Sequence, residues 1–129
     1  MQHSIYFFLS HIKYLHLALS QANLSFANLT AANLTGANLT RANLREADIS
    51  EANLSNAKLI QANLEDAYLH KTNLSSVKLD KAKLKKANFA GADLNNVNLV
   101  GSDLQGANLS QANLEDANLT SGLQNKRKT

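Results

Sequence analysis

Lysine is the residue type whose spacing most clearly suggests chemistry in this sequence. Five lysines fall within nine residues, close enough to present several cations to one anionic partner. Charge runs are usually solvated surface, so two interpretations stay open: an ordinary lysine-rich surface, or a contact for an acidic protein, a phospholipid or a nucleic acid. The candidate partner-binding patch consists of Lys78, Lys81, Lys83, Lys85 and Lys86.

Histidine, serine and cysteine give no catalytic or metal-binding pattern. His70 has no acid and nucleophile in a recognisable arrangement with it. His11 and His16 are five residues apart, which does not place two ligands on one helix face. The absence of cysteine excludes disulfides, thiolate metal sites and thiol nucleophiles. We therefore predict a protein that is not an enzyme and that binds no cofactor or metal.

Composition narrows the class of partner. The 129 residues suit one domain, and the formal net charge of +3 is only mildly basic. A dedicated nucleic-acid-binding domain is more strongly basic, and no aromatic residue is interleaved with the five lysines to stack on bases. The composition argues against nucleic acid and favours an unidentified protein partner.

The element that must position these side chains is a repeat of five residues. Twenty units run from residue 22 to residue 121 without insertion or deletion. The third place is Leu except at Ile49 and Phe89, the first is usually Ala, the second is usually Asn or Asp, and the last two places vary freely. The exceptions are Thr72, Val77, Val97 and Ser102 at the first place, and Lys58, Tyr68, Lys78 and Lys83 at the second.

A period of five excludes a helix and a flat strand as the repeating element. On an α-helix of about 3.6 residues per turn the leucines would spread around the axis, and on a strand they would alternate between faces. A chain that turns a corner with every unit buries each Leu beside an Ala, and four units close one square coil. The repeat predicts an all-β solenoid of about five coils, stacked about 4.7–4.9 Å apart, with residues twenty apart in register.

Stacking in this register makes two further predictions about the polar places. Asn side chains at the second place are expected to hydrogen-bond from one coil to the next. At the fourth and fifth places, charges of opposite sign alternate between coils, which predicts a ladder of exposed ion pairs. The two charged columns are Arg45, Glu65, Lys85 and Glu46, Asp66, Lys86.

The repeat resembles that of the pentapeptide-repeat proteins, whose motif is A(N/D)LXX. The resemblance covers residues 22–121, more than three quarters of the chain. It implies a right-handed quadrilateral β-helix, a handedness that the period alone does not give. It also implies an alternative function, because quinolone-resistance members bind DNA gyrase and some resemble duplex DNA in shape and negative charge. This chain departs from that pattern, since its net charge is positive and no loop interrupts its repeats.

Residues 1–21 are predicted to form an amphipathic helix, because apolar residues recur there at three- and four-residue spacing. The helix is expected to cap the first coil, whose apolar interior and backbone edge need covering. Two alternatives stay open: a secretory signal ending at Ala18-Leu19-Ser20, and a membrane-surface helix over residues 1–20. The apolar residues are Ile5, Phe8, Leu9, Ile12, Leu15 and Leu19.

Residues 122–129 are predicted to be a basic, disordered tail, since Gly122 breaks the register and lysine and arginine follow. The tail is too short to cover the last coil well. The C-terminal coil is therefore expected to expose apolar surface, which makes it a candidate interface for a homodimer.

Together these features favour a non-enzymatic module, a rigid rod that serves as a protein-interaction or scaffold unit. Two alternatives are kept: a gyrase- or topoisomerase-binding DNA mimic, and a membrane-associated or lumenal repeat protein. We expect a cytoplasmic location, or a secreted, periplasmic or thylakoid-associated one if residues 1–20 are a targeting segment.

An Asp in place of a central Leu, such as Leu64→Asp, is expected to unfold the rod. The change removes roughly 1.5–3 kcal/mol of apolar burial and puts a carboxylate in a core that offers it no partner. Circular dichroism would show loss of the folded signal, whereas Asp at a variable fourth place, as in Ser55→Asp, should leave the signal intact. A folded Leu64→Asp variant would contradict the solenoid.

Overall fold

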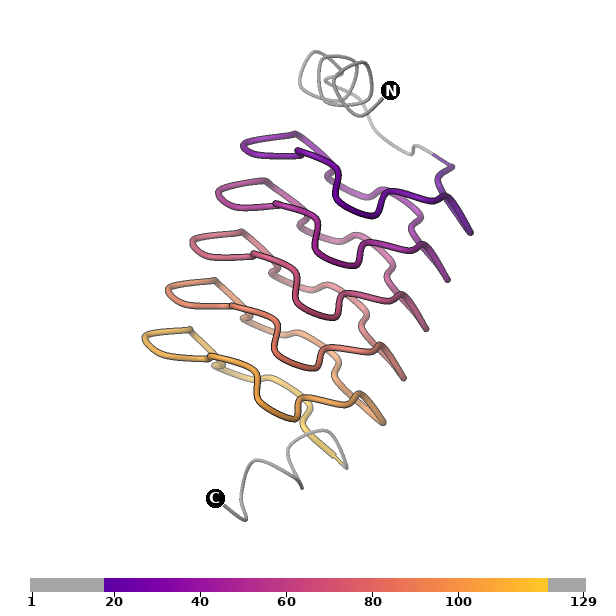
Figure 1. Cartoon of the computed structure of the whole chain (residues 1–129). Helices are drawn as coiled ribbons and strands as arrows, with labels where there is room; N and C mark the ends of the chain where they lie inside the picture. The colour runs from indigo at the N-terminus through magenta and orange to yellow at the C-terminus, as the bar shows by residue number, and fades with distance from the viewer. Residues whose placement is uncertain (1–17, 121–129) are drawn as a thin grey trace.

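The computed structural model describes residues 18–120, which form one stack of coils (Figure 1). Isolated parallel bridges join residues twenty apart, from Ala18↔Asn38 at one end to Asn98↔Asn118 at the other. One turn of the stack therefore takes four units, which is the register that the repeat predicts. Within residues 18–120 there are only single-residue bridges and turns, without an α-helix or a longer strand.

Each corner of the coil is a tight turn with a left-handed residue. The carbonyl of each third-place Leu accepts a hydrogen bond from the N–H three residues on, as Leu24 does from Ala27 at 3.1 Å. The fifth-place residue between them has φ between 57° and 75° from Gln21 to Asp116. Positive φ at that position is the arrangement of a type II turn. The fifth place is therefore more restricted than its variety of residue types suggests. The place carries four glycines and no Val, Ile or Thr.

In a unit inside the stack that has Asn or Asp at the second place, every backbone N–H has a defined acceptor. In the unit 42–46, three donors bond to neighbouring coils and one closes the corner turn. The remaining donor, the N–H of Arg45, bonds to the side-chain Oδ1 of Asn43 at 3.1 Å. The other four bonds run from Ala42 to Leu39, Asn43 to Ala22, Leu44 to Asn63 and Glu46 to Glu65.

The second-place Asn is thus a local turn residue and not mainly a rung between coils. In each described unit that has Asn or Asp there, the side-chain Oδ1 accepts from the fourth-place N–H at 3.0–3.2 Å. A rung between coils does form from Asn113 Nδ2 to Asp93 Oδ1 at 3.2 Å. The predicted Asn ladder is therefore wrong as a general feature, because the oxygen is used within its own unit.

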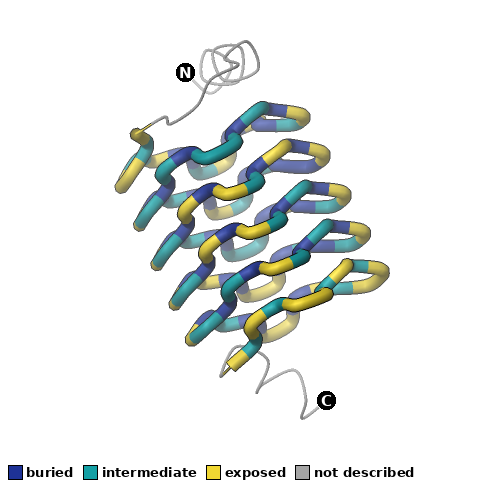
Figure 2. Tube along the Cα trace, turned by 180° about the vertical axis from the view of Figure 1, so that it is seen from behind, coloured by how far each residue is buried: buried dark blue, intermediate teal, exposed yellow. Residues whose placement is uncertain are grey.

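The core is a column of Leu and Ala. Buried residues recur from coil to coil along the stack (Figure 2). The third-place side chains from Leu24 to Leu104 are 0–3% exposed, and Phe89 fits among them at 1%. Two first-place hydroxyls are also buried, and each donates to a backbone carbonyl: Thr72 to Ile49 at 2.9 Å and Ser102 to Leu99 at 2.8 Å. Polar exceptions in the Ala column are therefore tolerated where a carbonyl is in reach.

The stack begins earlier than the sequence predicts. Ala18 pairs with Asn38, and the N–H of Leu19 donates to the Asn38 carbonyl at 2.8 Å. Residues 18–21 therefore belong to the first coil and not to a capping helix over residues 1–21. Ala18 replaces the usual Asn or Asp, so the motif is hidden, but Leu19 keeps the register.

The remainder of the predicted capping helix, residues 1–17, lies outside the described residues, as does the predicted tail at 122–129. Leu109, Leu114 and Leu119 at the C-terminal end of the described stack are only partly buried. A homodimer through this coil stays a prediction. No helix within residues 18–120 has the length and apolar character needed to cross a membrane.

The left-handed corner generates a stability prediction at Ala31, which is exposed and has φ 59°. Ala31→Gly should raise the free energy of unfolding by up to about 1 kcal/mol. An L-residue at positive φ costs roughly 1–2 kcal/mol, and glycine removes this strain but also increases the conformational entropy of the unfolded chain, which offsets part of the gain. Ala31→Val should lower it by more than about 1 kcal/mol. Denaturant unfolding would measure both. Thr30→Val, at the neighbouring fourth place, is the matched control and should be nearly neutral; equal effects at the two places would contradict the assignment.

Candidate functional site: the lysine belt

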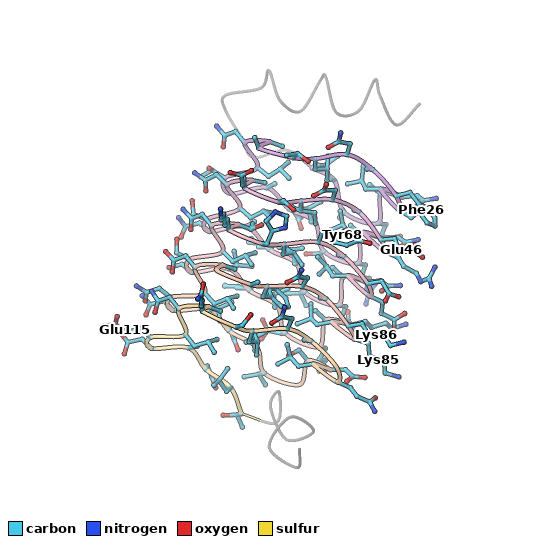
Figure 3. All side chains as sticks on the ribbon, turned by 60° about the vertical axis from the view of Figure 1, so that its left-hand side comes forward. Phe26, Glu46, Tyr68, Lys85, Lys86 and Glu115 are labelled. Atoms are coloured by element: carbon cyan, nitrogen blue, oxygen red, sulfur yellow. The ribbon has the colours of Figure 1, made fainter. Side chains whose placement is uncertain are left out.

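The structure brings all five predicted lysines onto one coil. Residues 78–86 span two adjacent sides of the rod: face four, which contains the unit 77–81, and face one, which contains the unit 82–86. The five side chains therefore form a band across the rod and not a stripe along it, and all are exposed. We call Lys78, Lys81, Lys83, Lys85 and Lys86 the lysine belt. Figure 3 shows Lys85 and Lys86 together on the edge that also carries Glu46 and Phe26.

A sixth lysine, which the patch predicted from sequence omits, adjoins the belt. Lys58 and Lys78 are bridge partners on consecutive coils, and both side chains are exposed. Sequence proximity does not reveal Lys58, but the twenty-residue register does, since Lys58 and Lys78 occupy the same place one coil apart.

Most of the predicted ion-pair ladder does not form between coils. Arg45 contacts Glu46 of its own coil at 2.9 Å and Asp66 of the next coil at 3.8 Å. In the belt, the Lys85 ammonium lies 4.0 Å from the Asp103 carboxylate. Within residues 18–120, the other four belt lysines make no ion pair within 4.0 Å, so Glu65 and Asp66 do not neutralise Lys85 and Lys86 as the columns predict.

Three lysines of this surface replace a residue that the turn needs. Lys58, Lys78 and Lys83 stand at the second place, where Asn or Asp accepts the fourth-place N–H in the other units. A lysine side chain has donors and no acceptor, so it cannot make that bond. Of the four exceptions at this place in residues 22–121, the remaining one is Tyr68, on another face of the rod. Lysine at this place therefore adds charge at the cost of a turn hydrogen bond.

The carboxylate of Asp80, which lies within the belt, has a hydrogen-bond partner for only one of its two oxygens. Its Oδ2 accepts a hydrogen bond from Asn98 Nδ2 at 3.0 Å, whereas Oδ1 is buried with no hydrogen-bond partner. The residues at the same place on the adjacent coils are Ile60 and Val100, which offer no polar side chain. Asp80 lies within 4.0 Å of no lysine ammonium in the described part of the chain. It lowers the charge of the belt without pairing with it.

Charge is divided between the sides of the rod. Residues 18–120 contain nine Lys and Arg against ten Asp and Glu, so the positive net charge of the chain comes from residues outside this range. Faces four and one hold eight of those nine cations and five of the acids, whereas the other two faces hold Lys71 and the other five acids. The eight cations are Arg41, Arg45, Lys58 and the five belt lysines.

His70 has a partner that the sequence analysis did not find. Its Nδ1 lies 2.8 Å from Ser50 Oγ on the preceding coil. Ser50 is only 3% exposed, so its hydroxyl is not accessible to a substrate, and the pair links two coils. The described residues contain no group of three His, Cys, Asp or Glu side chains that could hold a metal ion.

Known protein families and structures are similar to this chain over nearly all of the described stack. The family model Pentapeptide repeats (8 copies) matches residues 19–56, 47–85 and 82–120. Rfr23, a pentapeptide repeat protein from the cyanobacterium Cyanothece 51142, is 31% identical over 81% of this chain and 84% of its own, with a TM-score of 0.79. No curated protein sequence matches the chain.

Two other similar structures are less close in shape. HetL from Nostoc sp. strain PCC 7120, a pentapeptide repeat protein involved in heterocyst differentiation regulation, is 32% identical over 85% of this chain and 61% of its own, with a TM-score of 0.48. QnrB1, a plasmid-mediated fluoroquinolone resistance protein, is 21% identical over 85% of this chain and 71% of its own, with a TM-score of 0.44. Pentapeptide repeat proteins such as these form right-handed β-helices.

The poorly satisfied carboxylate yields a prediction. Asp80→Val should raise the free energy of unfolding by about 1 kcal/mol, because it removes a buried acceptor without a partner and places an apolar side chain between Ile60 and Val100. Denaturant unfolding would measure the change. Asp93→Val is the control: Asp93 accepts from the Asn95 N–H and from Asn113, so its loss should destabilise the rod. Destabilisation by Asp80→Val would mean that its bond to Asn98 is the stronger effect.

Proposed function

The chain belongs to the pentapeptide-repeat family, and from that premise we propose that it is a non-enzymatic rod that binds a partner protein through the lysine belt. The Leu and Ala side chains of the repeat are buried in the core, and its backbone N–H groups bond to adjacent coils or close the turns. Specific recognition must therefore come from side chains at the second, fourth and fifth places, which point outward. The belt is the region of this surface where positive charge is most concentrated.

One observation carries the proposal. Lys58, Lys78 and Lys83 lie on adjoining parts of faces four and one, and each occupies a place where Asn or Asp would complete the turn. A net hydrogen bond contributes about 0.5–1.5 kcal/mol, so each substitution gives up stability of that order. Departures from a local structural rule that gather on one surface are typical of functional sites. Three such departures that all add positive charge favour a binding role for this surface.

The described residues support a binding role and not a chemical one. The Ser50 and His70 pair is buried at its hydroxyl end and links two coils. The belt consists of lysine ammoniums, which bind anions, with no nucleophile and base in hydrogen-bond contact beside them. The absence of a catalytic function is part of the proposal.

A protein partner suits the belt better than a nucleic acid or a DNA-mimic role. Acids lie on both coils next to the belt, with Glu65 and Asp66 on one side and Asp103 on the other. A phosphate backbone carries uniform negative charge and would meet these acids, whereas a protein surface can place neutral or basic groups opposite them. The likeness to QnrB1 shows the fold alone, so its resistance function is not transferred.

The test uses variants that weaken binding and strengthen the fold. In the triple variant Lys58→Asn, Lys78→Asn, Lys83→Asn, each new Asn can accept the fourth-place N–H, so the free energy of unfolding should rise by about 0.5–1.5 kcal/mol per site. Affinity capture from the lysate of the source cell should lose the partner that the parent protein retains. Mass spectrometry would identify that partner.

Tyr68→Asn is the matched control, because it restores the same turn bond without changing charge. It should stabilise the rod and retain the partner. A triple variant that captures the same proteins as the parent would show that the belt is ordinary surface. Loss of the partner by Tyr68→Asn would show that recognition does not depend on the belt charge.

A further inference from the structure

The coil next to the belt lacks side chains directly beneath two of the belt lysines. A Cβ atom added to Gly101 would lie 3.2 Å from Lys81 Cγ, and one added to Gly106 would lie 3.3 Å from Lys86 Cγ. Both glycines are exposed. Any larger residue at these corners would press on the aliphatic part of the lysine above it. We call these two positions the glycine notches.

One notch opens into a hollow. The residues that line this shallow depression in the rod surface are Lys85, Lys86, Gln105 and Gly106. All three side chains can donate hydrogen bonds to an oxyanion. Lys85 also contacts Asp103 at 4.0 Å, whereas Lys86 makes no ion pair within the described residues. The hollow therefore offers a largely unneutralised cation beside a side-chain-free corner.

A lysine stacked on a glycine recurs one corner earlier on the coil. Lys81 lies over Gly101 as Lys86 lies over Gly106, and Lys81 makes no ion pair with the described residues. The two notches are five residues apart, one repeat unit, and Lys83 and Lys85 lie on the stretch of the belt between them. The arrangement suits an extended chain that crosses the rod along face one and carries more than one negative charge.

We propose that the lysine belt binds an acidic segment of a partner polypeptide, which seats one carboxylate in the hollow at Lys86 and Gly106 and a second over Gly101 beside Lys81. This inference rests on the proposed function and names the chemistry of its partner. Carboxylates fit because the ammonium of lysine acts as a point charge that a flexible acidic side chain can approach from the open corner. The exposed aromatic residues Phe26 and Tyr68 lie outside the belt, so base stacking adds nothing at this site.

The test fills the notches while it leaves every lysine in place. Asn is suited to this purpose, because Asn56 and Asn96 already occupy the fifth place with φ 62° and 60°. The double variant Gly101→Asn, Gly106→Asn would be titrated with fluorescein-labelled poly-L-glutamate, and binding would be followed by fluorescence anisotropy at low ionic strength. Gly91→Asn is the matched control, because Gly91 lies beneath Lys71, away from the belt, with a Cβ-to-Cγ distance of 3.6 Å. Circular dichroism would establish that each variant is folded.

The double variant should bind poly-L-glutamate about fivefold more weakly than the parent, a change of about 1 kcal/mol, as expected for two exposed ion pairs. The double variant Lys81→Gln, Lys86→Gln should weaken binding by at least as much. The two control variants, Gly91→Asn and Lys71→Gln, should leave the affinity for poly-L-glutamate unchanged. Unchanged affinity in the folded double variant would overturn the inference, and so would an equal loss in Gly91→Asn.

Duplex DNA of matched charge separates a peptide site from a general polyanion surface. The peptide assignment would be overturned if the duplex bound as tightly as poly-L-glutamate and if the double variant Gly101→Asn, Gly106→Asn weakened the binding of both to the same extent. If the parent protein fails to bind poly-L-glutamate but still captures a partner that depends on the belt charge, the acidic segment is wrong and the proposed function stands. If capture does not depend on the belt charge, the proposed function fails.

Discussion

The hydrogen bond from the fourth-place N–H to the second-place Oδ1 is the interaction on which the regularity of this rod depends. In the units with a coil on both sides, three of the five N–H groups bond to adjacent coils, and a fourth closes the corner. Only the fourth-place donor lacks a backbone acceptor, and the Asn or Asp two residues earlier supplies one, as Asn43 does for Arg45. A buried or half-buried amide without a partner costs free energy comparable to a lost hydrogen bond. The preference for Asn and Asp in the motif follows from this single unpaired donor.

The units without Asn or Asp at the second place lack this turn hydrogen bond, so their distribution on the rod is informative. Leu and Ala cannot vary much, because their side chains fill the column between four walls. The second place can vary, because its side chain faces outward, but each departure from Asn or Asp removes one turn bond. Lys58, Lys78 and Lys83 therefore combine a local cost in stability with a local gain in positive charge. Their neighbour Asp80 adds a second local cost, a buried carboxylate oxygen with no partner. The belt is thus the part of the rod that departs most from the hydrogen-bonding pattern of the repeat.

The stacking also decides which charges can act together. Charges that are close in sequence lie across one coil, and charges twenty residues apart lie on neighbouring coils. The five belt lysines are brought together by sequence proximity, whereas Lys58 joins them only through stacking on Lys78. Eight of the nine cations in residues 18–120 lie on two faces, whereas the ten acids are divided equally between those two faces and the other two, so the sides of the rod differ in charge although the overall charge of this range is nearly balanced. A partner would therefore be oriented by the side of the rod that it meets.

The sequence by itself determined the fold to a large extent. The unbroken period of five, with Leu19 to Leu119 in phase, allows only a coil that turns with every unit, and the four-unit turn and the lysine patch follow from it. The left-handed fifth place was open to the same reasoning through its four glycines and its lack of β-branched residues. Only the tertiary structure decided where the second-place oxygens bond, which ion pairs form, that Ser50 contacts His70, and that Gly101 and Gly106 lie against the aliphatic stems of Lys81 and Lys86. Periodicity fixes which residues share a column, but side-chain rotamers and the competition between local and inter-coil partners are settled only when the coils are in contact.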